Sequence, residues 1–172
     1  SESFNYDGLE NQMEGKHRPG HFDGVGTIVK RLFEIVQPNK AYFGEKDFQQ
    51  LQIVKKLVSK YNIPVDVIGC PIHREVNGLA MSSRNERLSE TAREKAAIIY
   101  QILNSAKEIF QTNSAEQTIK FVENEFKKHP EFELEYFEIA DEATLLPVSE
   151  KESEKKYRGF IAIFIENIRL ID

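Results

Sequence analysis

The stretch AYFGEKDFQQLQIVKKLVSKYNIPVDVIGCP, residues 41–71, decides the fold of the first half of the chain. It opens with a short apolar run, continues with apolar residues at helical spacing from about residue 46 to 61, and closes with a second apolar run over residues 63–71. Short apolar runs bounded by turn residues are typical of buried strands. A strand, a helix and a second strand in that order predict a right-handed crossover between parallel strands.

Polar residues follow directly on the first of these strands. Gly44 ends the apolar run, and Lys46, Asp47 and Gln50 share the first turn of the predicted helix. In parallel sheets, ligands bind beyond the carboxyl end of a strand, where helix N-termini attract anions. These residues therefore favour a phosphate site, although the same pattern is typical of an acid at a helix start with a lysine in solvent.

A second candidate site is the segment GLAMSSRN, residues 78–85. Ser82 and Ser83 offer short donors, and Arg84 offers a planar guanidinium that matches phosphate oxygens in pairs. A Ser-Ser-Arg tripeptide is also common in solvated turns, so the composition leaves both interpretations open. If the segment is a site, we expect Lys46 and Arg84 to converge on one polyanion.

The composition predicts a soluble globular protein. Hydrophobic residues make up 40% of the 172 residues and charged ones 30%, and no apolar run approaches the ~20 residues that span a bilayer. A net charge of -5 without a basic face argues against a nucleic-acid partner. Cys70 is the only cysteine, which excludes an intrachain disulfide and a cysteine metal cluster and fits a cytoplasmic location.

The first residues predict a loop and then a helix. The chain opens on Ser1 in a polar stretch, without an initiator methionine, which suggests a piece of a longer protein. Residues 1–19 carry only scattered apolar residues, so we expect a loop there. Apolar residues at helical spacing over residues 21–36 predict a helix, with Pro38 just beyond its end.

The second half predicts helices followed by an antiparallel sheet. Ser89 is a candidate cap for an uninterrupted helix, and Ser114 forms a capping box with Gln117 at the start of another. Residues 132–141 alternate as a strand, with a bulge indicated by two adjacent aromatic residues. An apolar run over residues 160–170 predicts one continuous strand.

Residues 44–50 and 78–85, together with the RPGHF sequence at residues 18–22, resemble the pantoate beta-alanine ligase family. The resemblance is specific over about the first ninety residues and continues beyond them only in the order of elements. It implies an α/β fold: a partial Rossmann-like nucleotidylyltransferase domain with parallel strands over residues 1–72, and a small carboxy-terminal α+β lid domain over residues 73–172. The second domain would hold two helices and an antiparallel sheet.

The family resemblance also implies a reaction and its participants. The carboxylate of pantoate attacks the α-phosphorus of ATP, pyrophosphate leaves, and the amine of β-alanine displaces AMP from the acyl adenylate. The implied cofactors are ATP and Mg²⁺, the latter held mostly by phosphates and water, with no metal site made by the protein. The implied partners are the small-molecule substrates and a second copy of the chain in a homodimer, with no nucleic acid and no membrane.

Residue roles follow from the same resemblance. Lys46 and Arg84 correspond to the catalytic cations, and Gln50 corresponds to the glutamine that binds pantoate. The predicted nucleotide-binding residues are Gly44, Glu45, Lys46, Asp47, His73, Met81, Ser82, Ser83 and Arg84.

One departure from the family bears on activity. The family's His-x-Gly-His motif does not occur in the sequence, and none of the four histidines lies in such a motif. We therefore expect little or no turnover from these residues alone. Two alternatives stay open: a non-catalytic nucleotide-binding or dimerising fragment, and another adenylate-forming ligase on the same fold.

Overall fold

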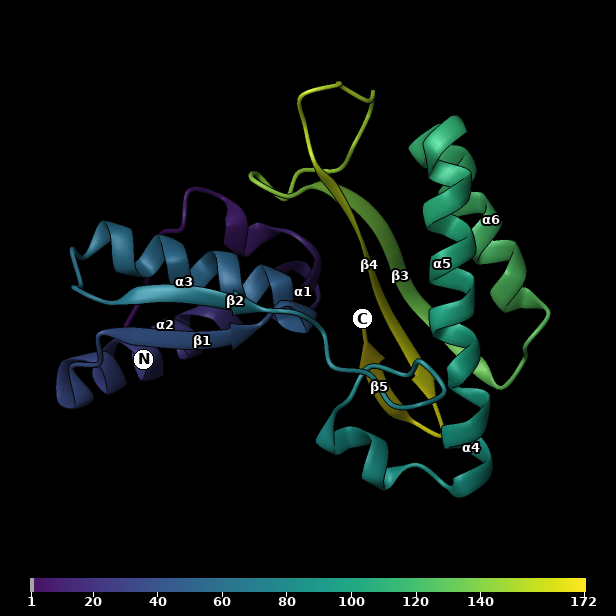
Figure 1. The fold of residues 1–172 in the computed structure, drawn as a ribbon, viewed down its shortest axis with the longest axis horizontal. Coiled ribbons are helices and arrows are strands. Elements are labelled where there is room, and N and C mark those ends of the chain that lie inside the picture. Colours follow the sequence, from purple (N-terminus) through teal and green to yellow (C-terminus); the bar gives the residue numbers. More distant parts are fainter. Residues whose placement is uncertain (1) are drawn as a thin grey trace. The chain divides into compact units, whose positions relative to one another are not determined.

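The computed structural model describes residues 2–172, so Ser1 lies outside the described residues. The chain divides into two compact units. The first unit runs to Pro71 and takes in Ala143–Leu145, and the second comprises Ile72–Glu142 and Leu146–Asp172. Each unit has its own sheet, a parallel pair in the first and three antiparallel strands in the second (Figure 1).

The first unit contains the predicted strand–helix–strand arrangement. It consists of β1 (Lys40–Gly44), α3 (Phe48–Lys60) and β2 (Asp66–Cys70). The two strands pair in parallel, with Ala41 opposite Val67. The predicted parallel pairing is confirmed, and it places the end of β1 beside the end of β2.

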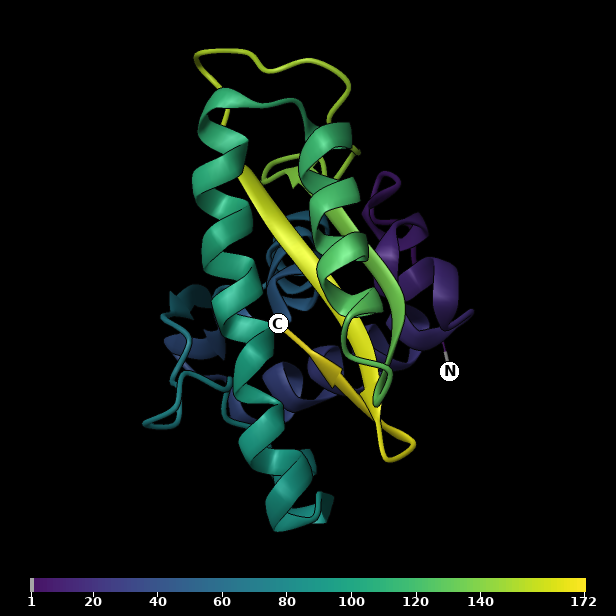
Figure 2. The ribbon, with the colours of Figure 1, turned by 90° about the vertical axis from the view of Figure 1, so that its right-hand side faces the viewer.

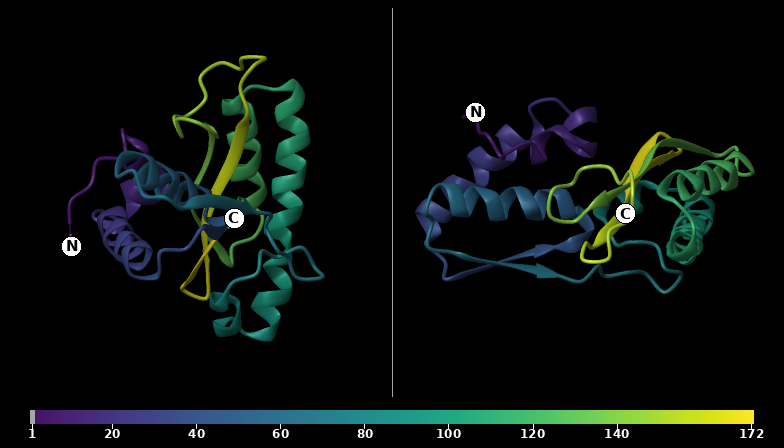
Figure 3. Two further views of the ribbon diagram at one scale, coloured as in Figure 1. Left: turned by 60° about the vertical axis from the view of Figure 1, so that its left-hand side comes forward. Right: turned by 90° about the horizontal axis from the view of Figure 1, so that it is seen from above.

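The core of the first unit lies on one face of this strand pair. Phe33 of α2 (His21–Val36) and Val54 of α3 are buried together, and the Phe33 ring meets the Phe43 ring edge-on at 6.5 Å. Figure 3 shows α3 running along the two strands. The helix predicted over residues 21–36 is therefore confirmed, but part of its apolar surface, including Leu32 and Ile35, is exposed.

The prediction of a loop over residues 1–19 is wrong. The segment contains a short 3-10 turn, η1 (Leu9–Asn11), and the helix α1 (Met13–His17). Its apolar residues Tyr6 and Met13 are each 1% exposed, and the Tyr6 hydroxyl donates to the Phe22 carbonyl at 3.1 Å. Burial against the rest of the unit orders this segment, a tertiary effect that local sequence pattern does not carry.

The second unit packs helices on one face of an antiparallel sheet. Its strand order is β3–β4–β5, and Figure 2 shows α5 and α6 side by side in front of the sheet. The elements of this unit are η3 (Ser83–Arg87), α4 (Glu90–Lys95), α5 (Ala97–Thr112), α6 (Ala115–Lys127), β3 (Phe132–Asp141), β4 (Tyr157–Ile165) and β5 (Ile168–Ile171).

The predicted helix caps and strand bulge of the second unit are confirmed. The Ser89 hydroxyl accepts from the Ala92 N–H at 3.1 Å, and Ser114 forms a full capping box with Gln117. The register of β3 against β4 shifts between Leu134 and Tyr136. This bulge keeps buried side chains on the helix-facing side along the whole strand.

Two boundaries in the second unit were predicted wrongly. The helix that Ser89 caps is divided at Ala96 into α4 and α5. The continuous strand expected over residues 160–170 is a hairpin, because Glu166 and Asn167 have φ values of 50° and 60° and reverse the chain. Two-residue hairpin loops of type I′ need positive φ at both central positions, and the usual glycine signal for such a loop is missing here.

Candidate functional site

The predicted nucleotide residues of the first unit lie in a 3-10 turn, η2 (Glu45–Asp47), between β1 and α3. Gly44 has an ordinary extended conformation, with φ -70° and ψ 136°, and a Cβ there would meet no atom within 4 Å. Neither the backbone nor the packing of the unit requires glycine at this position. In contrast, the Glu45 carboxylate lies against β2, 3.3 Å from where a Cβ on Gly69 would stand.

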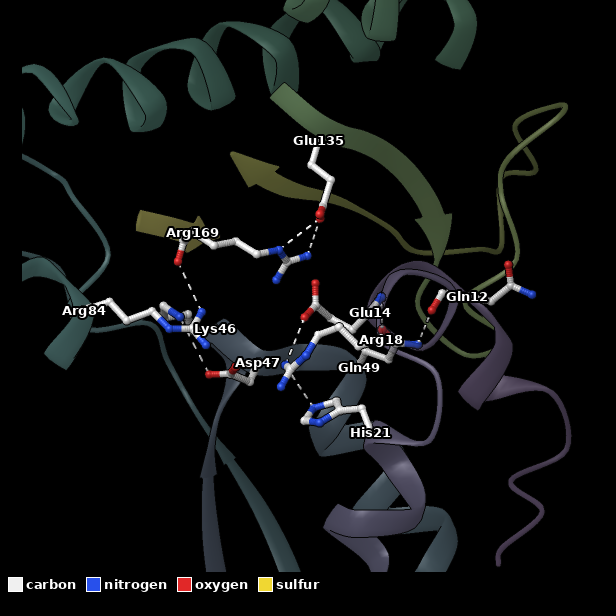
Figure 4. Close-up of polar contacts among 10 residues, drawn as sticks. All are labelled: Gln12, Glu14, Arg18, His21, Lys46, Asp47, Gln49, Arg84, Glu135 and Arg169. Atoms are coloured by element: carbon white, nitrogen blue, oxygen red, sulfur yellow. Dashed lines mark hydrogen bonds and ion pairs between the residues drawn. The ribbon is translucent and has the colours of Figure 1, made fainter. Parts of the chain in front are cut away.

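Lys46 is the cation at the end of β1. Its side chain is only 17% exposed, and its ammonium lies 3.8 Å from the Asp47 carboxylate, as Figure 4 shows. That distance is an ion pair but not a hydrogen bond, and partly exposed pairs of this kind are weak. Among residues 2–172, the Lys46 ammonium has no other charged partner within 4.0 Å, so its donors remain available to a ligand.

Gln49 and Gln50 stand next to each other but have different roles. Gln49 is 4% exposed, and its amide donates to the Leu9 and Gln12 carbonyls at 2.8 Å each. Its carbonyl oxygen accepts from the Glu14 N–H at 3.0 Å. Gln49 therefore fastens the amino-terminal segment to α3, a role that the sequence analysis missed, whereas the half-buried Gln50 is not used in this way.

The segment that Gln49 fastens carries a polar cluster of its own. Glu14 lies in α1 and accepts from the Arg18 guanidinium at 3.4 Å. The same guanidinium nitrogen lies 3.3 Å from Nε2 of His21, at the start of α2 (Figure 4). This cluster includes Arg18 and His21 of the RPGHF sequence, and Glu14 is tied to the buried Gln49 amide.

In the second unit, residues 73–81 form a tight hairpin. Arg74 pairs with Ala80 in an isolated antiparallel bridge, and the Met81 N–H donates to the His73 carbonyl at 3.0 Å. Gly78 turns the chain with φ 93°, a conformation that other residues rarely adopt. A Cβ at Gly78 would stand 2.4 Å from the Tyr100 ring, so glycine is required there by both backbone and packing.

Arg74 fixes this hairpin to the body of the unit. Its guanidinium donates to both carboxylate oxygens of Asp172, at 2.5 and 2.8 Å, and to the Gly78 carbonyl at 3.1 Å. It also lies 3.9 Å from the centre of the Tyr100 ring. Arg74 thus serves the fold, although it also lies among the residues that line the hollow beside the hairpin.

An open hollow of about 570 Å³ lies beside the hairpin. His73 and Met81 both line it, together with Glu75 and Arg93. The structure therefore brings two of the predicted nucleotide-binding residues to one concave surface.

Ser82, Ser83 and Arg84 follow the hairpin and start η3. The Ser82 hydroxyl accepts from the Arg84 N–H at 3.2 Å, so Ser82 caps this turn, while the Ser83 side chain is exposed. The Arg84 guanidinium donates to the Arg169 carbonyl at 3.2 Å, and the Arg169 side chain pairs with Glu135 (Figure 4). One bond to a neutral oxygen leaves most of the five Arg84 donors free of the fold.

The charges around the hairpin are paired. Arg93 hydrogen bonds to Glu75 lower the pKa of the Glu75 carboxyl, and the Asn85 amide lowers it further. Glu75 is therefore an ionised acceptor at neutral pH.

Within residues 2–172, no group of three or more His, Cys, Asp or Glu side chains is arranged to hold a metal ion.

The structure thus gathers the predicted residues into two sets. Residues 44–50 of the first unit follow one strand, whereas in the second unit His73 and Met81 are the two ends of one hairpin and residues 82–84 follow it. Lys46 and Arg84 belong to different units, so their convergence stays a prediction. No helix within residues 2–172 has the length and apolar character needed to cross a bilayer.

These features define a mixed α/β protein with polar residues at the carboxyl end of a parallel strand and an antiparallel, helix-covered second unit. The family model for Pantoate-beta-alanine ligase matches residues 2–172, and the chain belongs to this family. It is 64% identical to the pantothenate synthetase of Flavobacterium psychrophilum over 100% of this chain, and 47% identical to that of Bacteroides fragilis over 98%.

Solved structures agree with this assignment. The chain is similar to pantothenate synthetase from Thermus thermophilus, with a TM-score of 0.90 and 42% identity, covering 100% of this chain and 61% of that one. It is also similar to a pantoate-beta-alanine ligase from Francisella tularensis complexed with beta-gamma ATP and beta-alanine, with a TM-score of 0.69 and 33% identity, covering 100% of this chain and 56% of that one. The chain spans about 61% of the length of the first curated relatives that it matches.

Proposed function

We propose that this chain provides part of the active site of an ATP-dependent ligase that condenses pantoate with β-alanine through a pantoyl adenylate, releasing AMP and pyrophosphate. Family membership over residues 2–172 carries the proposal. The solved relative from Francisella tularensis, which holds beta-gamma ATP and beta-alanine, supports ATP and β-alanine as ligands. In this proposal the first unit is a partial Rossmann-like nucleotidylyltransferase domain and the second is the lid.

The geometry at the end of β1 fits a nucleotide. Gly44 has open space where a side chain would stand, although the fold does not demand glycine, and close approach of a ligand to the backbone explains that choice. Lys46 places a cation with available donors beside this space. We assign Gly44 and Asp47 to the ribose, Lys46 to a phosphate, and the half-exposed Gln50 amide to pantoate.

The second unit supplies the other phosphate donors. Ser83 is exposed and Arg84 has unused guanidinium donors, so both can bind phosphate oxygens, while the hollow lined by His73 and Met81 suits a base. Neither half-reaction needs a protein nucleophile. The residues instead provide positive charge and fixed donors toward the charge that develops on the phosphates.

Mg²⁺ fits this site only as an ion that arrives with the nucleotide. The residues described offer no ready cluster of three metal ligands, and Mg²⁺ commonly keeps several waters and binds substrate phosphates. When bound, it would neutralise phosphate charge. The part assigned to Lys46 and Arg84 is separate from this, because each would contact phosphate oxygens directly.

ATP titration by calorimetry tests the residue assignments. We expect Lys46→Ala and Arg84→Ala each to weaken ATP binding by about 10- to 100-fold, because hydrogen bonds to charged groups contribute ~1.5–3 kcal/mol. Lys55→Ala removes an exposed cation from α3, which follows Lys46, and Arg87→Ala removes one from η3, which contains Arg84; both serve as matched controls. Equal effects of the predicted and control variants would contradict the assignments.

The double variant examines convergence on one triphosphate. If Lys46 and Arg84 bind the same polyanion, the free-energy losses of the single variants will not add in the Lys46→Ala/Arg84→Ala chain. Additive losses would mean that each cation acts independently.

AMP formation from ATP, pantoate and β-alanine should stay at background, because the His-x-Gly-His motif is absent from the sequence. Robust turnover would contradict this expectation.

A second candidate function is self-association, and one observation favours it. Ile28, Leu32, Ile35 and Val36 expose apolar surface along α2. Apolar patches of this kind mark contact surfaces, and a second copy of the chain is the partner we propose. Analytical ultracentrifugation tests this proposal: the chain carrying both Leu32→Glu and Ile35→Glu should sediment as a monomer.

We also propose a cytoplasmic location, because a single cysteine fits a reducing compartment.

A further inference from the structure

Asn85 is a buried polar residue that joins both sides of the Ser82–Arg84 segment. Its side chain is 1% exposed, and its amide nitrogen donates to Oε1 of Glu75 at 2.8 Å and to the Ala80 carbonyl at 3.0 Å. Its backbone N–H donates to the Ser82 carbonyl at 3.0 Å. One residue therefore holds the backbone on either side of Met81.

Glu75 determines which way the Asn85 amide points. Arg93 of α4 donates through Nε and Nη2 to the two carboxylate oxygens of Glu75, at 3.0 and 2.9 Å. The carboxylate is thus a fixed anionic acceptor, and only the nitrogen side of the Asn85 amide can face it and the Ala80 carbonyl together. The other side of the amide, Oδ1, is buried and has no hydrogen-bond partner within residues 2–172.

An unsatisfied buried oxygen is costly, so this orientation is kept for the two bonds made by the nitrogen. The segment that these bonds hold spans the start of a short turn: Ser82 is extended, with φ -156° and ψ 145°, and Ser83 and Arg84 are the first two residues of η3. Donors that bind a phosphate in a set arrangement need a backbone that does not move.

We propose that Asn85, oriented by Glu75 and Arg93, is a positioning residue that holds Ser82, Ser83 and Arg84 in the conformation that binds a triphosphate. Asn85 touches no ligand in this scheme and acts only through the segment it holds. The inference rests on the proposed function for the identity of the ligand. It adds a positioning role for Asn85, Glu75 and Arg93, none of which is among the predicted nucleotide-binding residues.

The test uses the 172-residue chain with Asn85→Asp and Asn85→Ala, and the exposed Asn104→Asp of α5 as the matched control. An ionised carboxylate at position 85 cannot donate to Glu75 or to the Ala80 carbonyl, whereas a protonated one can donate once. The charged groups around position 85 are Glu75 and Arg93, with Glu86 acting on Arg93. Proximity to Glu75 and burial both raise the pKa of the introduced carboxyl.

We expect ATP affinity of Asn85→Asp to fall about tenfold or more at pH 8 and to recover in part at pH 5.5, each relative to the unsubstituted chain at the same pH. Asn85→Ala should be equally weak at both pH values, and Asn104→Asp should bind normally. A purely structural defect would not be relieved by acid. Equal affinity of Asn85→Asp and the unsubstituted chain at pH 8 would overturn the proposal.

Amide hydrogen exchange separates this inference from the proposed function. In Asn85→Ala, exchange should quicken at residues 81–86 and stay unchanged in β3 and β4, which reports loss of local positioning without loss of the fold. Unchanged exchange at residues 81–86 would overturn the proposal whatever the ligand. If the unsubstituted chain binds no ATP, the proposed ligand is wrong, and the exchange result still decides whether Asn85 holds the segment.

Discussion

The two polar segments of the molecule are held by different means. Residues 44–47 lie at the end of β1 and directly before α3, so the strand and the helix set their positions. Residues 73–85 contain no long element and are held instead by side-chain bonds, chiefly those of the partly buried Arg74 and Glu75 and the buried Asn85. A site residue at a strand end inherits its position from the sheet, whereas one on a loop depends on residues that never touch the ligand.

The largest expected difference in stability is between substitutions of Gly78 and Gly44. Gly78→Ala should destabilise the second unit by about 2 to 4 kcal/mol, because backbone strain and overpacking each cost ~1–3 kcal/mol and a Cβ would stand 2.4 Å from the Tyr100 ring. Gly44→Ala should leave stability unchanged and weaken ATP binding. Hydrogen exchange across α5 and α3 measures the two units separately; equal stability losses would remove the contrast.

Adjacent glutamines sharpen the comparison inside the first unit. Gln49→Ala should lower the free energy of unfolding of that unit by about 1 to 3 kcal/mol, since it leaves buried backbone groups without partners. Gln50→Ala should leave stability within experimental error and impair only pantoate binding. Urea unfolding of the two variants checks this, and a stability loss in Gln50→Ala as large as in Gln49→Ala would contradict it.

Lowering the pH should have the smallest effect on stability, and this effect should be confined to the second unit. The hydrogen bonds from Arg93, followed by the bond from Asn85, hold the pKa of Glu75 below its usual value of 4.5. Its stabilising contribution is therefore fully present above about pH 4.5 and is lost as the pH falls through the lower folded-state pKa. Between about pH 7 and 3, the thermal midpoint should fall further in the unsubstituted chain than in Glu75→Gln, with the exposed Glu94→Gln as control. Parallel curves would argue against this ion pair.

Sequence pattern predicted the elements whose signals are local. The parallel strands on either side of α3, the Ser89 and Ser114 caps and the bulge in β3 follow from apolar spacing and from short-range hydrogen bonding. The positions of residues 44–47 at a strand end were predictable for the same reason. Their roles toward ATP rest on resemblance and stay predictions.

What the pattern missed depends on contacts distant in sequence. The helix α1 forms on residues that read as a loop, because the Gln49 amide binds the carbonyls of Leu9 and Gln12. Asn85 gave no signal beyond its place after Arg84, since its partner Glu75 lies ten residues away in an irregular segment. The turn at Glu166 and Asn167 was missed because it lacks glycine.

The ion pair between Arg74 and Asp172 has a consequence for the order in which the molecule is built. The two residues are 98 positions apart, and β5, which precedes Asp172, is the last strand of the second sheet. During translation, the hairpin of residues 73–81 is made before Asp172, so the Arg74–Asp172 ion pair can form only after β5 has been translated. A nascent polypeptide released before that point would lack the carboxylate that binds Arg74, and its Ser-Ser-Arg segment would be held by the bonds among Glu75, Asn85 and Arg93.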